Sequence, residues 1–180
     1  MNKSIIALVI EDDPDDQEFF QIAVEKIGYQ VECSFIDDCT KALELLEKTD
    51  FLPDFIFVDV NMPKMNGLEC LEKIKTIGRL TQVPVYLYST SSEKNIADRC
   101  LALGGSGLIK KETSIAAIRD KLRCTFEKHL HSASWNTGKN GIHYLIAPIV
   151  VYTELTKTRK KILLNFCLLK IKPNFQLRTH

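Results

Sequence analysis

Short apolar runs alternate with amphipathic stretches along most of the chain. The run at residues 5–10 is almost wholly apolar and rich in β-branched side chains, as expected of a strand buried on both faces. Asp13 and Pro14 then provide a cap and a first turn for a helix that stops at Gly28. The apolar positions of this helix, at helical spacing, are Phe19, Phe20, Ala23, Val24 and Ile27.

The same alternation continues to about residue 128. The pattern predicts strands at 31–36, 55–58, 85–88 and 107–109, and helices at 39–48, 67–77, about 93–103 and 114 to about 128. Five strands that alternate with five helices predict an α/β fold with a doubly wound parallel sheet covered on both faces. In such sheets a ligand binds beyond the carboxyl ends of the strands, near the point where the strand order reverses.

The alternation fails beyond residue 130, and the charge changes there as well. Residues 1–130 carry 16 Lys and Arg against 22 Asp and Glu, whereas residues 131–180 carry 8 against 1. We therefore divide the chain into a domain at 1–130 and a basic C-terminal extension of unknown fold at 131–180. Such a basic segment can meet nucleic acid, anionic lipid or an acidic partner, and a solvated tail explains it equally well.

The composition is that of a globular protein rather than a disordered, fibrous or membrane chain, with 45% hydrophobic and 26% charged residues. The six cysteines form no CxxC pair and no zinc-type spacing with histidine, so we expect reduced thiols. The longest apolar stretch, at 142–152, is interrupted and shorter than the roughly 20 residues of a membrane span. With no signal peptide at the start, a cytoplasmic location is predicted.

Charged and polar residues stand directly after the predicted strands. Glu11 and Asp12 follow the first strand, Asp59 the third and Ser89 the fourth, and Lys111 comes just beyond the fifth. We expect these side chains to converge on one crevice, because the carboxyl ends of parallel strands meet at one edge of the sheet. Clustered carboxylates repel one another and so require a cation, and hard oxygen ligands suit Mg²⁺.

A carboxylate can also act as a nucleophile toward phosphorus and form an aspartyl phosphate, and Asp59 is the candidate. In phosphoryl transfer negative charge is spread over the oxygens of the moving group, so catalysis depends on positioning and on positive charge. Mg²⁺ and Lys111 would supply that charge, and the hydroxyl of Ser89 would supply a hydrogen-bond donor.

Four segments resemble the signature blocks of response-regulator receiver domains of two-component signalling, in the order and spacing of that family. They are residues 9–13, 58–67, 84–90 and 104–111, and the likeness covers residues 4 to about 128. It implies a flavodoxin-like sheet of order 2-1-3-4-5 in a single receiver of the chemotaxis-regulator type. Such a domain is a phosphoacceptor, not an enzyme, and acts through phosphorylation-dependent protein contacts.

The resemblance also implies residue roles and partners. Asp59 matches the residue that becomes 4-aspartylphosphate, and Ser89 and Lys111 match the catalytic and switch residues. The magnesium ligands would be Glu11, Asp12, Asp59 and the backbone carbonyl of Asn61. The phosphoryl donor would be a sensor histidine kinase or a histidine phosphotransfer protein, and the output an unidentified downstream protein, since no DNA-binding domain is evident.

Several residues depart from the family pattern or have a plainer explanation. Glu112 stands where the family usually has proline, so we expect the loop after Lys111 to differ from the family. Leu108 stands where the family usually has Tyr or Phe, so we expect switching to rely on Ser89 and the loop at 90–93. Asp15 and Asp16 are expected only to complement the start of the first helix.

Two other classes of protein were weighed against the receiver. A magnesium-dependent phosphatase of the haloacid-dehalogenase type also uses a nucleophilic aspartate. In that class the nucleophile lies on the first strand and a second aspartate follows two residues later. Here Asp59 belongs to the third predicted strand, and Asn61 stands two residues after it. A flavin-binding flavodoxin-like module is disfavoured because the first loop offers acid instead of a hydroxyl-rich phosphate cradle.

Overall fold

The computed structural model describes residues 4–91 and 93–133. In this part of the chain five strands alternate with five α-helices and one short 3₁₀ helix. In chain order these are β1 (Ile5–Ile10), α1 (Pro14–Glu25), β2 (Val31–Ile36), α2 (Cys39–Lys48), β3 (Phe55–Asp59), α3 (Gly67–Thr76), η1 (Gly78–Leu80), β4 (Val85–Ser89), α4 (Lys94–Ala102), β5 (Gly107–Lys110) and α5 (Ile115–Ala133).

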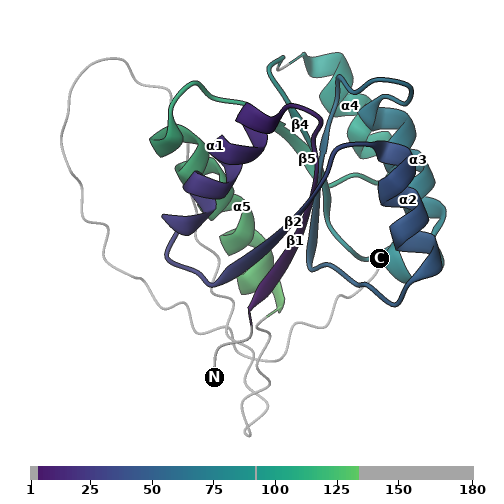
Figure 1. Cartoon of the computed structure of the whole chain (residues 1–180), viewed down its shortest axis with the longest axis horizontal. Coiled ribbons are helices and arrows are strands. Elements are labelled where there is room, and N and C mark those ends of the chain that lie inside the picture. Colours follow the sequence, from purple (N-terminus) through teal and green to yellow (C-terminus); the bar gives the residue numbers. More distant parts are fainter. Residues whose placement is uncertain (1–3, 92, 134–180) are drawn as a thin grey trace, which may run out of the picture. The chain divides into compact units, whose positions relative to one another are not determined.

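The strands form one parallel sheet in the order β2-β1-β3-β4-β5, which confirms the predicted doubly wound topology. Helices α1 and α5 cover one face of the sheet, and α2, α3 and α4 cover the other (Figure 1). The strand order reverses between β1 and β3, which pair directly along Ala7 to Ile10 and Phe55 to Val58. The carboxyl ends of these two strands therefore define the expected ligand site.

The core consists of two apolar clusters, one on each face of the sheet. Alternate residues of β1 point to opposite faces, so Leu8 and Ile10 join one cluster whereas Ala7 and Val9 join the other. Every residue of β3 is buried, because this central strand is covered on both sides. Burial on both faces explains why the strands appear in the sequence as continuous apolar runs.

Helix α1 begins as predicted but uses a narrower apolar face. The side chain of Asp13 accepts a hydrogen bond of 2.9 Å from the backbone N–H of Asp15, and Pro14 opens the helix. Phe20 is fully buried, whereas Phe19, which fits the apolar helical pattern equally well, is 45% exposed. Adjacent helix residues point about 100° apart, and only one of the two rings can face the sheet.

The ends of several elements differ from the prediction. Strands β3 and β4 each include one residue more, so Asp59 and Ser89 are the last residues of their strands. Helix α5 continues to Ala133, where the first of two compact units, Met1–Ala133, also ends. The extension expected at 131–180, for which the sequence predicts no fold, lies almost entirely outside the described residues.

The sequence pattern did not predict the 3₁₀ helix η1. Its residue Arg79 caps the end of α2. The guanidinium of Arg79 donates hydrogen bonds to the backbone carbonyls of Leu46, Thr49 and Phe51. The last carbonyls of a helix have no partner within the helix, and Arg79 satisfies them from a distant part of the chain.

Candidate functional site

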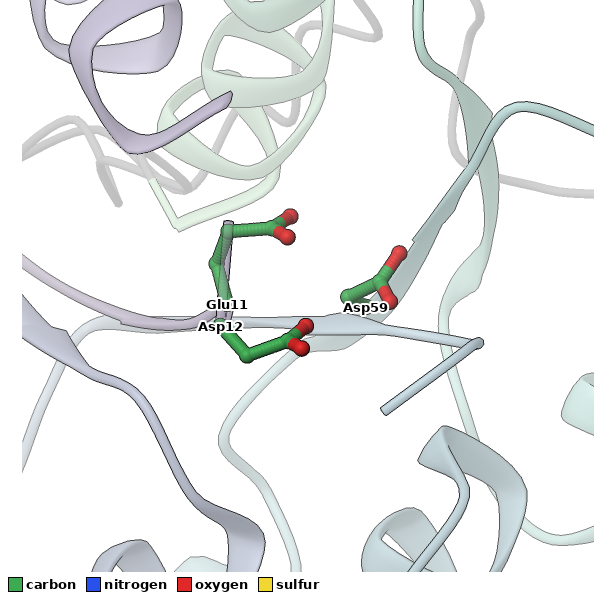
Figure 2. Close-up of side chains that lie close together, drawn as sticks. All are labelled: Glu11, Asp12 and Asp59. Carbon is green, nitrogen blue, oxygen red and sulfur yellow. The ribbon is translucent and has the colours of Figure 1, made fainter. Parts of the chain in front are cut away.

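Three carboxylates from the ends of β1 and β3 lie together. Glu11 and Asp12 directly follow β1, Asp59 ends β3, and each offers an oxygen within 4.8 Å of the others. Figure 2 shows the side chains of Glu11 and Asp12 extending from the end of β1 toward the side where Asp59 lies. The direct pairing of β1 with β3 brings these residues together from positions far apart in the sequence.

The three acids differ in exposure and in backbone support. Glu11 is 1% and Asp59 4% exposed, whereas Asp12 is open to solvent. The backbone N–H of Asn61 donates a hydrogen bond of 2.8 Å to Oδ2 of Asp59. One oxygen of Asp59 is thereby oriented by its own loop, and the other faces the interior of the cluster.

Lys111 lies at the centre of the cluster. Its Nζ is 2.7 Å from Oε2 of Glu11, 2.9 Å from Oδ1 of Asp59 and 2.7 Å from Oδ2 of Asp16, and its side chain is only 9% exposed. The ammonium also lies 5.3 Å from the centre of the Tyr88 ring. Lys110 is exposed, so the geometry settles which of the two adjacent lysines enters the site.

Burial and charge oppose each other in this cluster. Burial raises the pKa of Glu11 from 4.5 to about 7, Lys111 acts to lower it, and the charge of Asp59 adds to the rise. Burial by itself would lower the pKa of Lys111, but hydrogen bonds to Asp16, Glu11 and Asp59 outweigh it and the pKa is raised. Lys111 is therefore a permanent positive charge beside Asp59.

Ser89 is joined to the site through the backbone. It ends β4 and is fully buried, its Oγ accepts a hydrogen bond of 3.2 Å from the N–H of Ser91, and its carbonyl accepts one of 2.7 Å from the N–H of Lys111. This bond fastens the chain after β5 to the end of β4. Any movement of Ser89 is thus coupled to the base of the Lys111 side chain.

The structure brings together most residues that the sequence singled out, and one that it did not. Glu11, Asp12, Asp59 and Lys111 meet directly. Asp16 was expected only to complement the helix dipole, and this was wrong, because its carboxylate also pairs with Lys111. The sequence contained a signal for this contact, because Asp16 precedes the buried Phe20 by four residues and so shares the inward face of α1.

Glu112 and Leu108, the two positions that depart from the family pattern, make ordinary structural contacts. Glu112 pairs with Lys121 of α5, and no cis peptide bond occurs in the described residues. Leu108 is half-buried and packs against the apolar cluster on the side of α2, α3 and α4. The loop after β5 is therefore shaped by an ion pair to α5 instead of by proline.

The donor set fits a hard divalent cation. Three carboxylates supply oxygen ligands close together, and among the described residues the buried Oε2 of Glu11 is contacted only by the Lys111 ammonium, at 2.7 Å. A single ammonium does not neutralise the three acids and Asp16, so the cluster keeps a negative charge that a cation would offset.

The doubly wound sheet, with acids and a lysine at its carboxyl edge, defines a class of phosphoacceptor signalling domains. The family model of the response regulator receiver domain matches residues 7–123. The chain belongs to this family, and it is a phosphoacceptor module of two-component signal transduction. The family match gives the haloacid-dehalogenase alternative no support.

Individual relatives agree with this assignment. The chain is 27% identical over 128 residues to chemotaxis protein CheY-3 of Vibrio cholerae, a match that covers 71% of this chain and 96% of the relative. The phosphorylated cyanobacterial phytochrome response regulator RcpA has the same fold, with a TM-score of 0.66 at 24% identity over 73% of this chain and 98% of that one. The Mn²⁺-bound form of response regulator Rcp1 aligns with a TM-score of 0.62 at 21% identity, covering 71% and 96%.

None of the helices described here has the length and apolar character needed to cross a membrane.

Proposed function

We propose that Asp59 is the residue of this receiver that takes the phosphoryl group. The observation that carries the proposal is the position of Lys111, whose ammonium lies 2.9 Å from Oδ1 of Asp59 inside a cluster of acids. An Asp59 oxygen attacks the phosphorus atom of the donor and forms the new P–O bond. The P–N bond to the donor histidine breaks, and its electron pair leaves with the imidazole nitrogen.

The residues around Asp59 suit the charge that this transfer develops. Negative charge is spread over the phosphoryl oxygens in the transition state, and Lys111 already holds its N–H donors beside Asp59. The hydroxyl of Ser89, at the end of the next strand, is the second donor in the proposal. The backbone N–H of Lys111 donates to the carbonyl of Ser89, so the backbone segments that carry the two donors are joined.

The cofactor in this proposal is Mg²⁺. Glu11, Asp12, Asp59 and the backbone carbonyl of Asn61 would hold it, and it would supply further positive charge to the phosphoryl oxygens. Glu11 is the least exposed of the three acids, and its carboxylate already contacts Lys111. Among proteins of the same fold, Rcp1 is described in a Mn²⁺-bound form.

The proposed partners follow from the phosphoacceptor role. A sensor histidine kinase or a histidine phosphotransfer protein would donate the phosphoryl group, and the output would be an altered contact with a downstream protein, without catalysis of a further reaction. The half-buried Leu108 has no ring to reorient, so Ser89 and the following loop would carry the change. The cytoplasmic location remains a prediction of the sequence.

The test is phosphorylation by a small acyl phosphate with Mg²⁺, followed by mass spectrometry of the intact chain and its peptides. Wild-type protein should gain a single base-labile phosphoryl group on Asp59, and Asp59→Asn should gain none. Asp50→Asn, the same change at an exposed position, is the matched control and should be labelled like wild type. Equal labelling of Asp59→Asn would overturn the assignment.

A further inference from the structure

Asp16 is the partner of Lys111 that lies outside the acidic cluster. Its Oδ2 accepts a hydrogen bond of 2.7 Å from Nζ of Lys111, across 95 positions of the sequence. The carboxylate is 29% exposed, and it is not one of the three acids that could hold a metal ion together. Among the residues that the structure describes, its ion pair with the site is the one with Lys111.

A lysine ammonium has three N–H donors, and the described residues place three carboxylates around this one. Two of these carboxylates, Glu11 and Asp59, belong to the cluster that would hold a cation, and Asp59 is also the proposed phosphoacceptor. Both change their bonding during phosphoryl transfer. Asp16 takes part in neither event, so its bond to Lys111 can persist throughout.

Rigid parts of the fold hold this bond in place. Asp16 lies in the first turn of α1, which Asp13 caps and which Phe20 anchors in the core. Phe20 also packs edge-on against Tyr88, the ring beside the lysine ammonium, with ring centres 5.7 Å apart. The position of Asp16 is therefore set by the packing of α1 against the sheet, independently of the loops around the site.

We propose that Asp16 is a positioning residue, which keeps the Lys111 ammonium beside Asp59 while the phosphoryl group is transferred. The proposal rests on the proposed role of Asp59. With an acyl phosphate as donor, an Asp59 oxygen forms a bond to phosphorus, the P–O bond of the donor breaks, and its electron pair leaves with the carboxylate. The N–H of Lys111 that pointed at Asp59 then turns to a phosphoryl oxygen, while Asp16 retains another.

The first experiment compares the rate of phosphorylation in Asp16→Asn and Asp15→Asn. Both remove one charge from the first turn of α1, but the side chain of Asp15 is exposed and forms no ion pair found among the described residues. At saturating donor and Mg²⁺, Asp16→Asn should be phosphorylated about tenfold more slowly, since misplacing a charged group costs rate rather than ligand affinity. The Mg²⁺ dissociation constant, measured by calorimetry, should change less than about twofold.

The second experiment needs neither metal nor phosphoryl donor. Reductive methylation followed by mass spectrometry compares the reactivity of Lys111 with that of the exposed Lys110 in the same peptide region. In wild type Lys111 should react far more slowly than Lys110, and Asp16→Asn should raise the Lys111 to Lys110 ratio several-fold whereas Asp15→Asn leaves it unchanged. A merely structural role of Asp16 would not move this ratio selectively.

The outcomes separate the two proposals. Unchanged or faster phosphorylation of Asp16→Asn would overturn the positioning role, and so would an unchanged methylation ratio. If wild-type protein is not labelled on Asp59, the proposed function itself fails, while the methylation ratio still reports whether Asp16 holds Lys111.

Discussion

Gly67 packs directly against the backbone of Asp59. A Cβ atom at Gly67 would lie 2.3 Å from the carbonyl oxygen of Asp59 and 2.9 Å from Cα of Val60. The N–H of Gly67 donates a hydrogen bond of 3.0 Å to the carbonyl of Val60. The first turn of α3 therefore touches the end of β3, and a side chain at position 67 would displace the proposed phosphoacceptor.

The first prediction concerns this contact. Gly67→Ala should lower the free energy of unfolding by about 1–3 kcal/mol, because the added methyl group meets backbone that cannot yield. Urea unfolding followed by circular dichroism measures the change. Gly78→Ala is the matched control, since nothing lies within 4 Å of the added Cβ there. Equal stabilities of the two variants would contradict the close packing of Gly67 on Asp59.

The second prediction concerns Arg79, which donates to three carbonyls at and after the end of α2. Arg79→Lys keeps the charge but cannot reproduce the planar arrangement of donors, so it should cost about 1–3 kcal/mol. Hydrogen exchange should become faster in the last turn of α2.

Lys48→Gln is the control for Arg79→Lys. Lys48 pairs with Glu44 on the exposed surface of the same helix, and its loss should cost under about 0.5 kcal/mol. If Arg79→Lys exchanges no faster than this control, the capping role is wrong.

The third prediction is a pH dependence that arises from His129. Burial, followed by the charge of Lys128, lowers its pKa below the ordinary value of 6.5. Its Nε2 lies 2.7 Å from the hydroxyl of Tyr86. As the pH falls below 6.5, the unfolded chain takes up a proton at this position before the folded chain does, so stability present above that pH is lost.

In His129→Gln the free energy of unfolding should therefore decrease less as the pH falls below 6.5. Urea unfolding at a series of pH values measures this decrease. Lys128→Gln should flatten it only slightly, because burial is the larger cause of the lowered pKa. If the free energy of unfolding falls with pH to the same extent in wild type and His129→Gln, His129 is not the cause of the pH dependence.

The fourth prediction concerns the end of the domain. Helix α5 continues to Ala133, and His129 contacts Phe55 and Tyr86, with ring centres 5.4 and 5.8 Å apart. A chain that ends at Ala133 should unfold at the same urea concentration as the full chain. One that ends at Lys128 should lose about 1–3 kcal/mol, because the contacts of His129 are removed.

Circular dichroism is the suitable measurement for these truncations, since the single tryptophan, Trp135, lies beyond both ends. Loss of folding in the chain ending at Ala133 would show that the basic extension belongs to the domain. Equal stability of the two truncated chains would contradict the contribution of His129.

The sequence by itself determined the class of fold and most of the site. Alternating runs of apolar and amphipathic residues sufficed because strands buried on both faces leave a strong local pattern. The convergence of Glu11, Asp12, Asp59 and Lys111 also followed, since residues after parallel strands share one edge of the sheet.

Only the tertiary structure decided which face of α1 points inward and how far α5 extends. Two adjacent phenylalanines fit the helical pattern equally well, and packing against the sheet buried Phe20 and left Phe19 exposed. The same rotation of α1 turned Asp16 toward Lys111. Contacts between residues far apart in the chain, such as Asp16 with Lys111 and Tyr86 with His129, have no local signature, because they depend on how whole helices are placed on the sheet.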